Sequence, residues 1–236
     1  MTRTAIWTSI AATLESEIAA ELYTAGDKLP TEATLAARFG VNRHTVRRAL
    51  GDLADRGLLR SRRGAGVFVE APPTDYPIGR RVRFHQNIAA SGRLPAKERL
   101  RIETRASSTL EAEALELAAG ERVVVYEGLS MSGNAPLAHF ISVFPLGRFP
   151  DIAETFATIT SVTEALRQNG VADFTRRETR LTAEIASPTQ ALHLRLREGD
   201  ALLKSVAINV DAHGVPVEHG TTWFAGERVT LTITPE

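Results

Sequence analysis

Apolar residues recur at helical spacing in three successive stretches near the N-terminus. The first stretch, residues 6–22, carries an apolar residue at every fourth position. The second follows Thr31 and ends at Gly40, and the third follows Asn42; threonine and asparagine are favourable N-caps and glycine is a common helix end. We therefore expect three helices with one buried face each. The positions expected to be buried are Ile6, Ile10, Leu14, Ile18, Leu22, Leu35, Ala36, Phe39, Val46, Ala49, Leu50 and Leu53.

The polar face of the third expected helix is rich in arginine. Arg43 and Arg47 are one helical turn apart, as are His44 and Arg48, and all four lie near the start of the helix, away from its apolar stripe. Two short helices joined by a tight turn, the second with a basic outer face, are typical of a helix-turn-helix. In that motif the start of the second helix enters the major groove, where arginine bonds guanine and Thr45 or His44 can reach bases or phosphates.

A short apolar alternation follows the third helix. Leu58 and Leu59 precede an arginine turn, and residues 67–69 have the composition of a strand. This pattern predicts a β-hairpin, a wing beside the helix-turn-helix. Arg62, Arg63 and Gly64 lie at its tip, where the arginines can reach phosphates or the minor groove. A phosphate loop is excluded, because a strand rather than a helix follows the glycines.

Residues 70–77 contain three prolines and two acidic residues. This composition is typical of a stiff, solvated linker. We therefore expect a DNA-binding domain over residues 1–70, a linker over residues 71–77 and a second domain over residues 78–236.

The second domain contains an internal repeat. A helical segment, a glycine, an apolar run and a Gly-x-Pro turn occur twice in the same order, so that Gly199 matches Gly120 and Gly214 matches Gly133. Each copy predicts a short helix, a long strand, a hairpin and a second strand. Two such copies predict an α+β domain with one antiparallel sheet and helices packed alongside.

Composition narrows the class of protein. The 236 residues have no net charge, but residues 38–63 hold eight arginines against two aspartates. A basic stretch in a neutral chain fits a DNA-reading module, although a solvated charged face has the same composition. The absence of cysteine excludes disulfides and thiolate sites. No stretch approaches the roughly 18 apolar residues of a membrane span, so we expect a cytoplasmic protein without a membrane partner.

The order of motifs over residues 29–69 resembles the DNA-binding domain of the GntR superfamily: Leu-Pro-Thr-Glu, Phe-Gly-Val, Arg-x-Thr-Val-Arg-x-Ala-Leu and Gly-x-Gly-x-x-Val. The resemblance implies a homodimer on a palindromic operator in double-stranded DNA. It also implies DNA contacts from Arg43, Thr45, Arg47 and Gly64. One departure is Ala33, where many members carry an arginine. The full set of candidates for DNA contact is Thr31, Arg43, His44, Thr45, Arg47, Arg48, Arg62, Arg63 and Gly64.

Residues 76–236 resemble the effector domain of the HutC branch of these regulators, the UTRA domain, which has a chorismate-lyase-like fold. Within that branch, the segments 42–45, 83–88 and 173–181 are most similar to regulators of phosphonate metabolism. The resemblance implies a repressor whose small, anionic effector comes from phosphonate or phosphate metabolism. Sugar-phosphate sensors of the branch carry two arginines and a glutamate where this chain has Gly128, Ser130 and Phe140, which makes a sugar phosphate a weaker candidate.

An anionic effector requires positive charge or backbone amides. Arg83 and Arg176 would supply charge, unless they form surface salt bridges. Ser161 would supply a helix start, unless it acts only as an N-cap. Glu218 would bind an amine or pair with an arginine. The candidates for effector contact are Arg83, Phe84, Gln86, Asn87, Ser161, Arg176 and Glu218.

Enzymatic chemistry has little support in the sequence. None of the six histidines stands in an HExxH or HxH arrangement, and no Gly-x-Ser-x-Gly is present. We therefore expect no catalytic residue, no metal and no cofactor. Two alternatives stay open: an architectural DNA-binding protein with an inert dimerisation domain, and a HutC-type sensor of another metabolite, such as an amino-acid breakdown product or a sugar phosphate.

Overall fold

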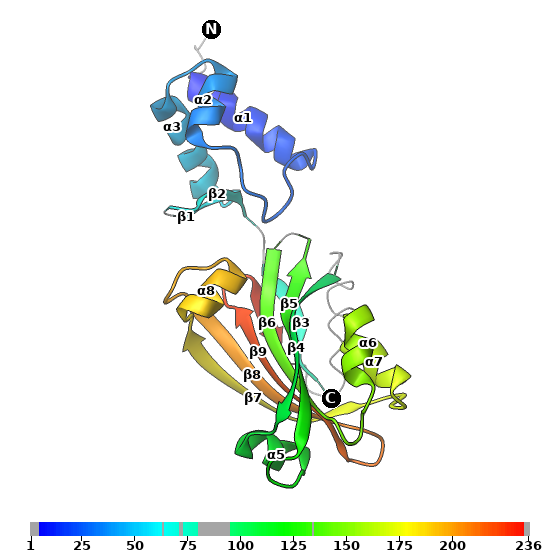
Figure 1. The fold of residues 1–236 in the computed structure, drawn as a ribbon. Helices are drawn as coiled ribbons and strands as arrows, with labels where there is room; N and C mark the ends of the chain where they lie inside the picture. The colour runs from blue at the N-terminus through cyan, green and yellow to red at the C-terminus, as the bar shows by residue number, and fades with distance from the viewer. Residues whose placement is uncertain (1–4, 63, 71–72, 80–94, 134, 234–236) are drawn as a thin grey trace. The chain divides into compact units, whose positions relative to one another are not determined.

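The computed structural model describes residues 5–62, 64–70, 73–79, 95–133 and 135–233. The chain divides into two compact units, Met1–Pro72 and Pro73–Glu236 (Figure 1). Each unit is described by itself below.

The N-terminal unit is a winged helix-turn-helix. Its elements are α1 (Ile6–Ala19), α2 (Glu32–Phe39), α3 (Arg43–Asp55), and the antiparallel strands β1 (Leu59–Arg62) and β2 (Gly66–Val69). The expected caps are confirmed. The Thr31 hydroxyl accepts a hydrogen bond from the Thr34 amide at 3.2 Å, and the Asn42 side chain accepts one from the Thr45 amide at 2.8 Å. Gly40 ends α2 in the left-handed conformation, with φ of 65°.

The core of this unit contains most of the predicted positions, including Leu14, Leu35 and Val46. Two predictions at the ends of α1 were wrong: Ile6 is 63% exposed and Leu22 is 70% exposed. The helix begins at Ile6 and ends at Ala19, so both side chains lie where the helix no longer covers the core.

The segment before α2 is hydrogen-bonded to β2 as a third extended segment of the wing, which the sequence pattern did not indicate. The Gly26 amide donates to the Val69 carbonyl at 3.1 Å, and the Leu29 amide donates to the Val67 carbonyl at 2.9 Å. These bonds satisfy backbone groups along one side of β2 and fix the wing to the helical core.

The C-terminal unit is built on one six-stranded antiparallel sheet with the strand order β4-β5-β6-β9-β8-β7. Its elements in chain order are β3 (Thr74–Pro77), β4 (Pro95–Ala106), α5 (Thr109–Leu115), β5 (Arg122–Ser132), β6 (Ala135–Pro145), α6 (Ile152–Thr158), α7 (Val162–Gln168), β7 (Thr175–Ile185), α8 (Pro188–Leu194), β8 (Ala201–Val210), β9 (Pro216–Ala225) and β10 (Val229–Thr232).

The internal repeat is confirmed in the topology. The copies are β4-α5-β5-β6 and β7-α8-β8-β9, and they meet where β6 pairs with β9. Both helices begin with a capping box, at Ser108 and Ser187, and both end at a left-handed residue, Glu116 and Arg195. Ser108 and Ser187 are separated by the same number of residues as Gly120 and Gly199, and so are Glu116 and Arg195. A long strand precedes each helix, which the repeat in the sequence did not reveal.

Part of the expected linker is a strand. Residues 74–77 form β3, which pairs in parallel with β10, and Tyr76 packs in an apolar cluster with Phe224 and Val229. Proline and acidic residues therefore did not mark a solvated segment along its whole length, because the register of β3 places every second side chain in the core.

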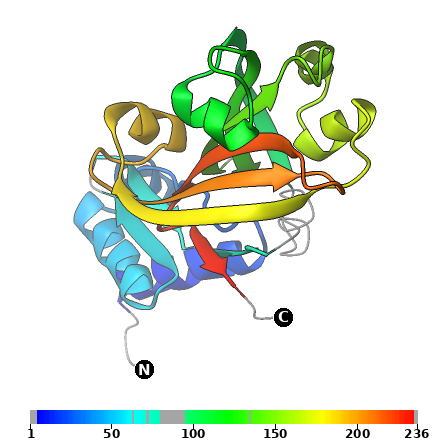
Figure 2. The same cartoon turned by 90° about the horizontal axis from the view of Figure 1, so that it is seen from below.

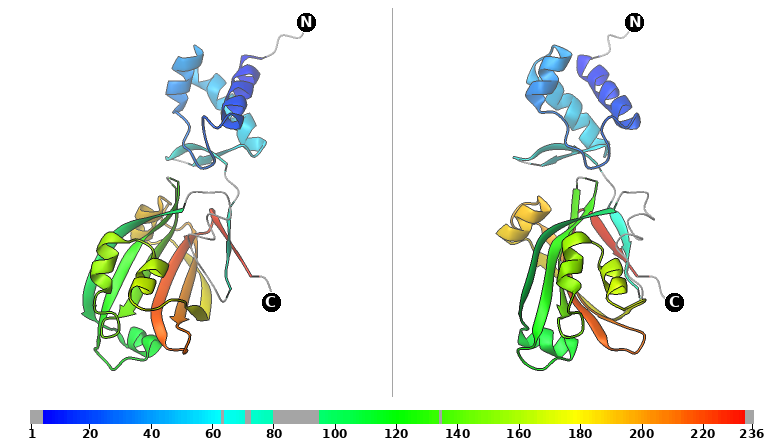
Figure 3. Two further views of the ribbon diagram at one scale, coloured as in Figure 1. Left: turned by 90° about the vertical axis from the view of Figure 1, so that its right-hand side faces the viewer. Right: turned by 45° about the vertical axis from the view of Figure 1, so that its right-hand side comes forward.

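The two faces of the sheet are covered differently. Tyr126, Phe140 and Phe144 pack with α6 and α7, which lie side by side against one face (Figure 3). Ala138 alternates with Phe140 on β6, so β3 and β10, which pack on Ala138, cover another part of the same face. Helices α5 and α8 lie on the other side of the sheet from β10 (Figure 2). In the described segments, no helix combines the length and hydropathy needed to cross a bilayer.

Candidate DNA-reading and effector sites

The start of α3 presents free positive charge. Arg43 and His44 are exposed, and within the described part of the chain neither has a hydrogen bond or salt bridge. Thr45 is half-buried, and its hydroxyl donates to the Asn42 side chain at 3.0 Å. Arg43 and His44 are therefore available to a ligand, whereas Thr45 already completes the cap.

Arg47 has an intramolecular partner that the sequence did not reveal. Its Nε donates to Glu32 Oε1 at 2.8 Å and its Nη2 donates to Glu32 Oε2 at 2.6 Å. These hydrogen bonds from Arg47 lower the pKa of the Glu32 carboxyl. Because Glu32 lies in the first turn of α2, the pair connects the two helices and orients the Arg47 guanidinium at the surface.

Two other DNA-binding candidates have structural contacts. The Arg48 guanidinium lies 4.6 Å from the centre of the Trp7 ring, a cation–π contact to α1. Thr31 caps α2. The helix spacing of Arg48 gave no sign of its contact, because Trp7 stands two helices earlier in the sequence.

The wing turns on glycines with positive φ, 78° at Gly64 and 117° at Gly66. A Cβ on Gly66 would lie 2.7 Å from Lys28 Cε, so the lysine side chain crosses the wing at this glycine. Lys28 is exposed and adds a cation that the sequence analysis missed. Arg63 and the side chain of Arg62 lie outside the described residues.

A polar network crosses the sheet of the C-terminal unit, on the face that α6 and α7 cover. Glu218 on β9 is buried; its Oε1 accepts from the Ser142 hydroxyl and its Oε2 accepts from Asn209 Nδ2, both at 2.6 Å. Asn209 Oδ1 in turn accepts from Arg176 Nε at 3.2 Å. Two predicted effector contacts, Arg176 and Glu218, are thus brought together through Asn209, which was not predicted.

A second cation approaches this network from β4. Lys97 lies with its Nζ 4.3 Å from the centre of the Phe140 ring. Burial lowers the pKa of Lys97 to about 8, against the opposing effect of the Glu218 charge. Burial also lowers the pKa of Arg176, again opposed by Glu218. One carboxylate thus faces two partly desolvated cations, a combination that favours a further negative charge nearby.

Phe140 fills the place where sugar-phosphate sensors would carry charge. It lies opposite Gly128 across β5 and β6, and a Cβ on Gly128 would come within 2.8 Å of the Phe140 ring. The glycine therefore makes room for the aromatic ring. Ser130, next on the same face, is buried.

The remaining effector candidates are not part of this network. Ser161 is the N-cap of α7, where its hydroxyl accepts from the Glu164 amide at 3.3 Å. Arg83, Phe84, Gln86 and Asn87 lie outside the described residues, so their proposed contact with the effector stays a prediction.

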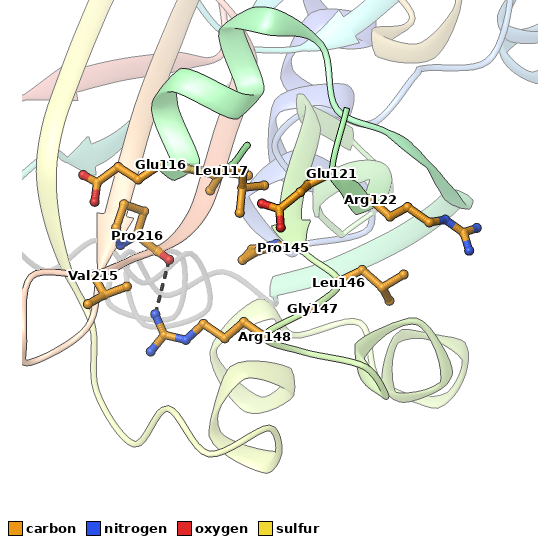
Figure 4. Close-up of a pocket in the computed structure, with 11 residues that line it drawn as sticks. Glu116, Leu117, Glu121, Arg122, Pro145, Leu146, Gly147, Arg148, Val215 and Pro216 are labelled. Atoms are coloured by element: carbon orange, nitrogen blue, oxygen red, sulfur yellow. Dashed lines mark hydrogen bonds between the residues drawn. The ribbon is translucent and has the colours of Figure 1, made fainter. Parts of the chain in front are cut away.

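A separate open pocket of about 450 Å³ lies between the end of α5 and the turn after β6 (Figure 4). Arg148 in this pocket donates to the Pro216 carbonyl at 3.3 Å and pairs with Asp211. Glu116 pairs with Arg177. Because the charges of Arg148 and Glu116 are already matched, and no predicted effector residue in the described part of the chain lines it, we do not assign the effector to this pocket.

Comparisons with known proteins agree with these observations. Residues 7–69 match the model of the family "Bacterial regulatory proteins, gntR family", and residues 90–230 match that of the UTRA domain. An HTH-type transcriptional regulator of Rhizobium meliloti is 36% identical over 97% of this chain and 94% of its own. The probable transcriptional regulator PhnF of Escherichia coli is 33% identical over 95% of this chain and 92% of its own.

The fold has a solved counterpart in PhnF from Mycobacterium smegmatis, with a TM-score of 0.68, 22% identity, and coverage of 98% of this chain and 99% of that one. The matching families and relatives are transcriptional regulators, not enzymes. Regulators of this kind bind DNA through the helix-turn-helix and small-molecule effectors through the UTRA domain. The chain belongs to the GntR family of bacterial transcriptional regulators, in its HutC branch, with an N-terminal winged helix-turn-helix and a C-terminal UTRA domain.

Proposed function

We propose that this protein is a cytoplasmic repressor that binds a palindromic operator as a homodimer and responds to an anionic effector of phosphonate or phosphate metabolism. Residues 1–70 bind DNA, and residues 78–236 bind the effector and form the dimer. The observation that carries the choice of effector is the group formed by Lys97, Arg176 and Glu218.

The charges of this group favour a zwitterion. Lys97 and Arg176 attract a phosphonate, while Glu218 is placed to accept an ammonium group. Glu218 is held by Ser142 and Asn209, so its carboxylate is oriented before the ligand arrives. An aminoalkylphosphonate carries both groups. The likeness to PhnF supports the same class of compound.

On DNA, two recognition helices enter successive major grooves, with half-sites roughly 10 base pairs apart. Arg43 reads a base edge directly. Arg47 also reads a base edge, once its guanidinium has released the Glu32 carboxylate or bonds the carboxylate and the base together. The wing positions the protein on the phosphate backbone through Lys28, Arg62 and Arg63.

A sensor of another metabolite is the alternative. An amino-acid breakdown product would also use a carboxylate and a cation, so Glu218 and Arg176 alone do not distinguish it from an aminoalkylphosphonate. A sugar phosphate is less favoured, because the Phe140 ring occupies the space over Gly128.

Thermal unfolding of the full chain against a panel of compounds tests the choice. The panel holds phosphate, methylphosphonate, 2-aminoethylphosphonate, glucosamine 6-phosphate, urocanate and amino acids. A compound that binds only the folded protein raises the midpoint as its concentration rises. We expect the largest shift from 2-aminoethylphosphonate; a shift from urocanate or glucosamine 6-phosphate alone would overturn the assignment to phosphonate metabolism while leaving the regulator function intact.

A further inference from the structure

Two histidines and a glutamate converge on the face of the sheet opposite the Glu218 network. Glu127 lies on β5, His139 on β6 and His193 on α8, and one possible ligand atom of each lies within 4.8 Å of the others. His139 alternates with Phe140 along β6, so its side chain points away from the effector face. The cluster is therefore separate from the proposed effector site.

His139 is held in place but not fully satisfied. It is buried, and its Nε2 is 2.8 Å from Glu127 Oε1. Its ring stacks on Trp223 at 5.3 Å and lies 5.1 Å from the His193 ring, centre to centre. Within the described residues, His139 Nδ1 has no hydrogen-bond partner. A buried polar atom without a protein partner is uncommon, and water, a ligand or a bound ion would satisfy it.

The Glu127 carboxylate is already oriented in the cluster. Its Oε1 lies 2.8 Å from His139 Nε2, and Arg101 Nε donates to its Oε2 at 3.0 Å. Imidazole nitrogens and carboxylate oxygens are common ligands of transition metals.

We propose that Glu127, His139 and His193 bind one divalent transition-metal ion, of the type of Zn²⁺, Ni²⁺ or Co²⁺. Two imidazoles and one carboxylate form a common donor set for these ions, with water in the remaining positions. Glu127 and His193 are only half-buried, so solvent can reach the cluster. The ion links α8 to the centre of the sheet and gives the domain a second ligand besides its effector.

The sequence predicted no metal site, because the three ligands have no short-range spacing. Glu127 and His139 belong to successive strands, and His193 lies much further along the chain, in the second copy of the repeat. Only the pairing of β5 with β6 and the packing of α8 on β6 bring them together.

A tryptophan beside the cluster can report metal binding. It has two tryptophans, Trp7 and Trp223, so the Trp7→Phe variant leaves only the ring that stacks on His139. The untagged, metal-free full chain of this variant is titrated with Co²⁺ or Ni²⁺, which quench nearby tryptophan fluorescence. We expect saturable quenching at one ion per chain, and equilibrium dialysis with Zn²⁺ to give the same stoichiometry.

Two further variants decide the site. His193→Ala and Glu127→Gln should each weaken binding by at least about tenfold, whereas His213→Ala, at an exposed turn, should bind as the parent does. Circular dichroism confirms that each variant is folded. Absence of saturable binding in the parent, or unchanged affinity in folded His193→Ala, would overturn the proposal.

Discussion

Replacing Glu218 with glutamine tests the polar network on the face of the sheet that α6 and α7 cover. The carboxylate accepts hydrogen bonds from Ser142 and Asn209 and sits near the charges of Lys97 and Arg176. A glutamine keeps one oxygen acceptor for Asn209, but its NH₂ group requires the Ser142 hydroxyl to turn and accept. It also removes the negative charge that both cations face. Breaking a buried, hydrogen-bonded charge in this way costs about 3 kcal/mol.

That free energy should appear as a lower unfolding midpoint of the C-terminal unit. For a domain of this size, about 1 kcal/mol corresponds to about 2–4 °C, so Glu218→Gln should lower the midpoint by about 6–12 °C. Trp223 fluorescence in the Trp7→Phe background follows this unit alone. Ser142→Ala is the matched control, because it removes one hydrogen bond to the same carboxylate and should cost only about 1 kcal/mol.

The same variant separates stability from selectivity. Without the Glu218 charge, methylphosphonate should bind more tightly, because the carboxylate no longer repels it, while the preference for 2-aminoethylphosphonate over methylphosphonate should disappear. Isothermal titration calorimetry measures both affinities. A midpoint lowered by less than in Ser142→Ala would refute the structural reasoning, and an unchanged preference would refute the role in binding an amine.

Three further predictions concern other parts of the molecule. Arg47→Ala should abolish specific operator binding at physiological salt and leave effector binding intact, because its guanidinium stands on the recognition helix; a fluorescence-anisotropy titration that still shows specific binding would contradict the docking. The ratio of the parent's affinity for methylphosphonate to that of the Lys97→Arg variant should fall as the pH rises above about 8, because Lys97 then loses its proton and arginine does not. A ratio that does not change with pH would exclude Lys97 from the site. Gly128→Ala should lower the free energy of unfolding by about 1–3 kcal/mol, because the new Cβ would lie 2.5 Å from the Glu98 carbonyl oxygen. Gly147→Ala, which has open space at its Cβ, is the control, and urea unfolding should give it a free energy within about 0.5 kcal/mol of the parent.

The helix-turn-helix could be predicted almost residue by residue because its determinants are local. Thr31 and Asn42 cap the helices that follow them, and Gly40 ends the helix before it. The errors came at Ile6 and Leu22, where periodicity continues past the residues that the core can cover. A hydrophobic period indicates a buried face but does not give its length.

For the UTRA domain, the sequence predicted the repeated order of elements but not which polar side chains meet. The repeated glycines indicated the helix-strand-hairpin order, whereas the pairing of β6 with β9 joins residues from different copies of the repeat. Ser142 meets Glu218 only through that pairing, whereas Asn209 lies opposite Glu218 within the β8–β9 hairpin. Ser142 and Asn209 each stand as a polar residue between apolar neighbours, and this pattern was the available signal that they lie inside the domain.

Two arginines predicted to contact DNA have intramolecular partners that the sequence did not indicate. Arg47 was expected to be a free base reader, yet Glu32 of α2 holds it, and Arg48 rests on Trp7. Both partners come from helices that sequence analysis placed correctly. Which side chains meet depends on how those helices cross, and helix spacing alone does not determine that angle.

The central claim, a DNA-binding regulator under the control of an anionic effector, is tested most directly by selecting operators from random duplex DNA with the full-length protein and then titrating the selected duplex with and without 2-aminoethylphosphonate. We predict a palindromic site and an effector-dependent change in Kd of about 5- to 150-fold, the usual range of allosteric coupling. Selection of no preferred sequence, or an unchanged Kd at an effector concentration that raises the unfolding midpoint, would contradict the account.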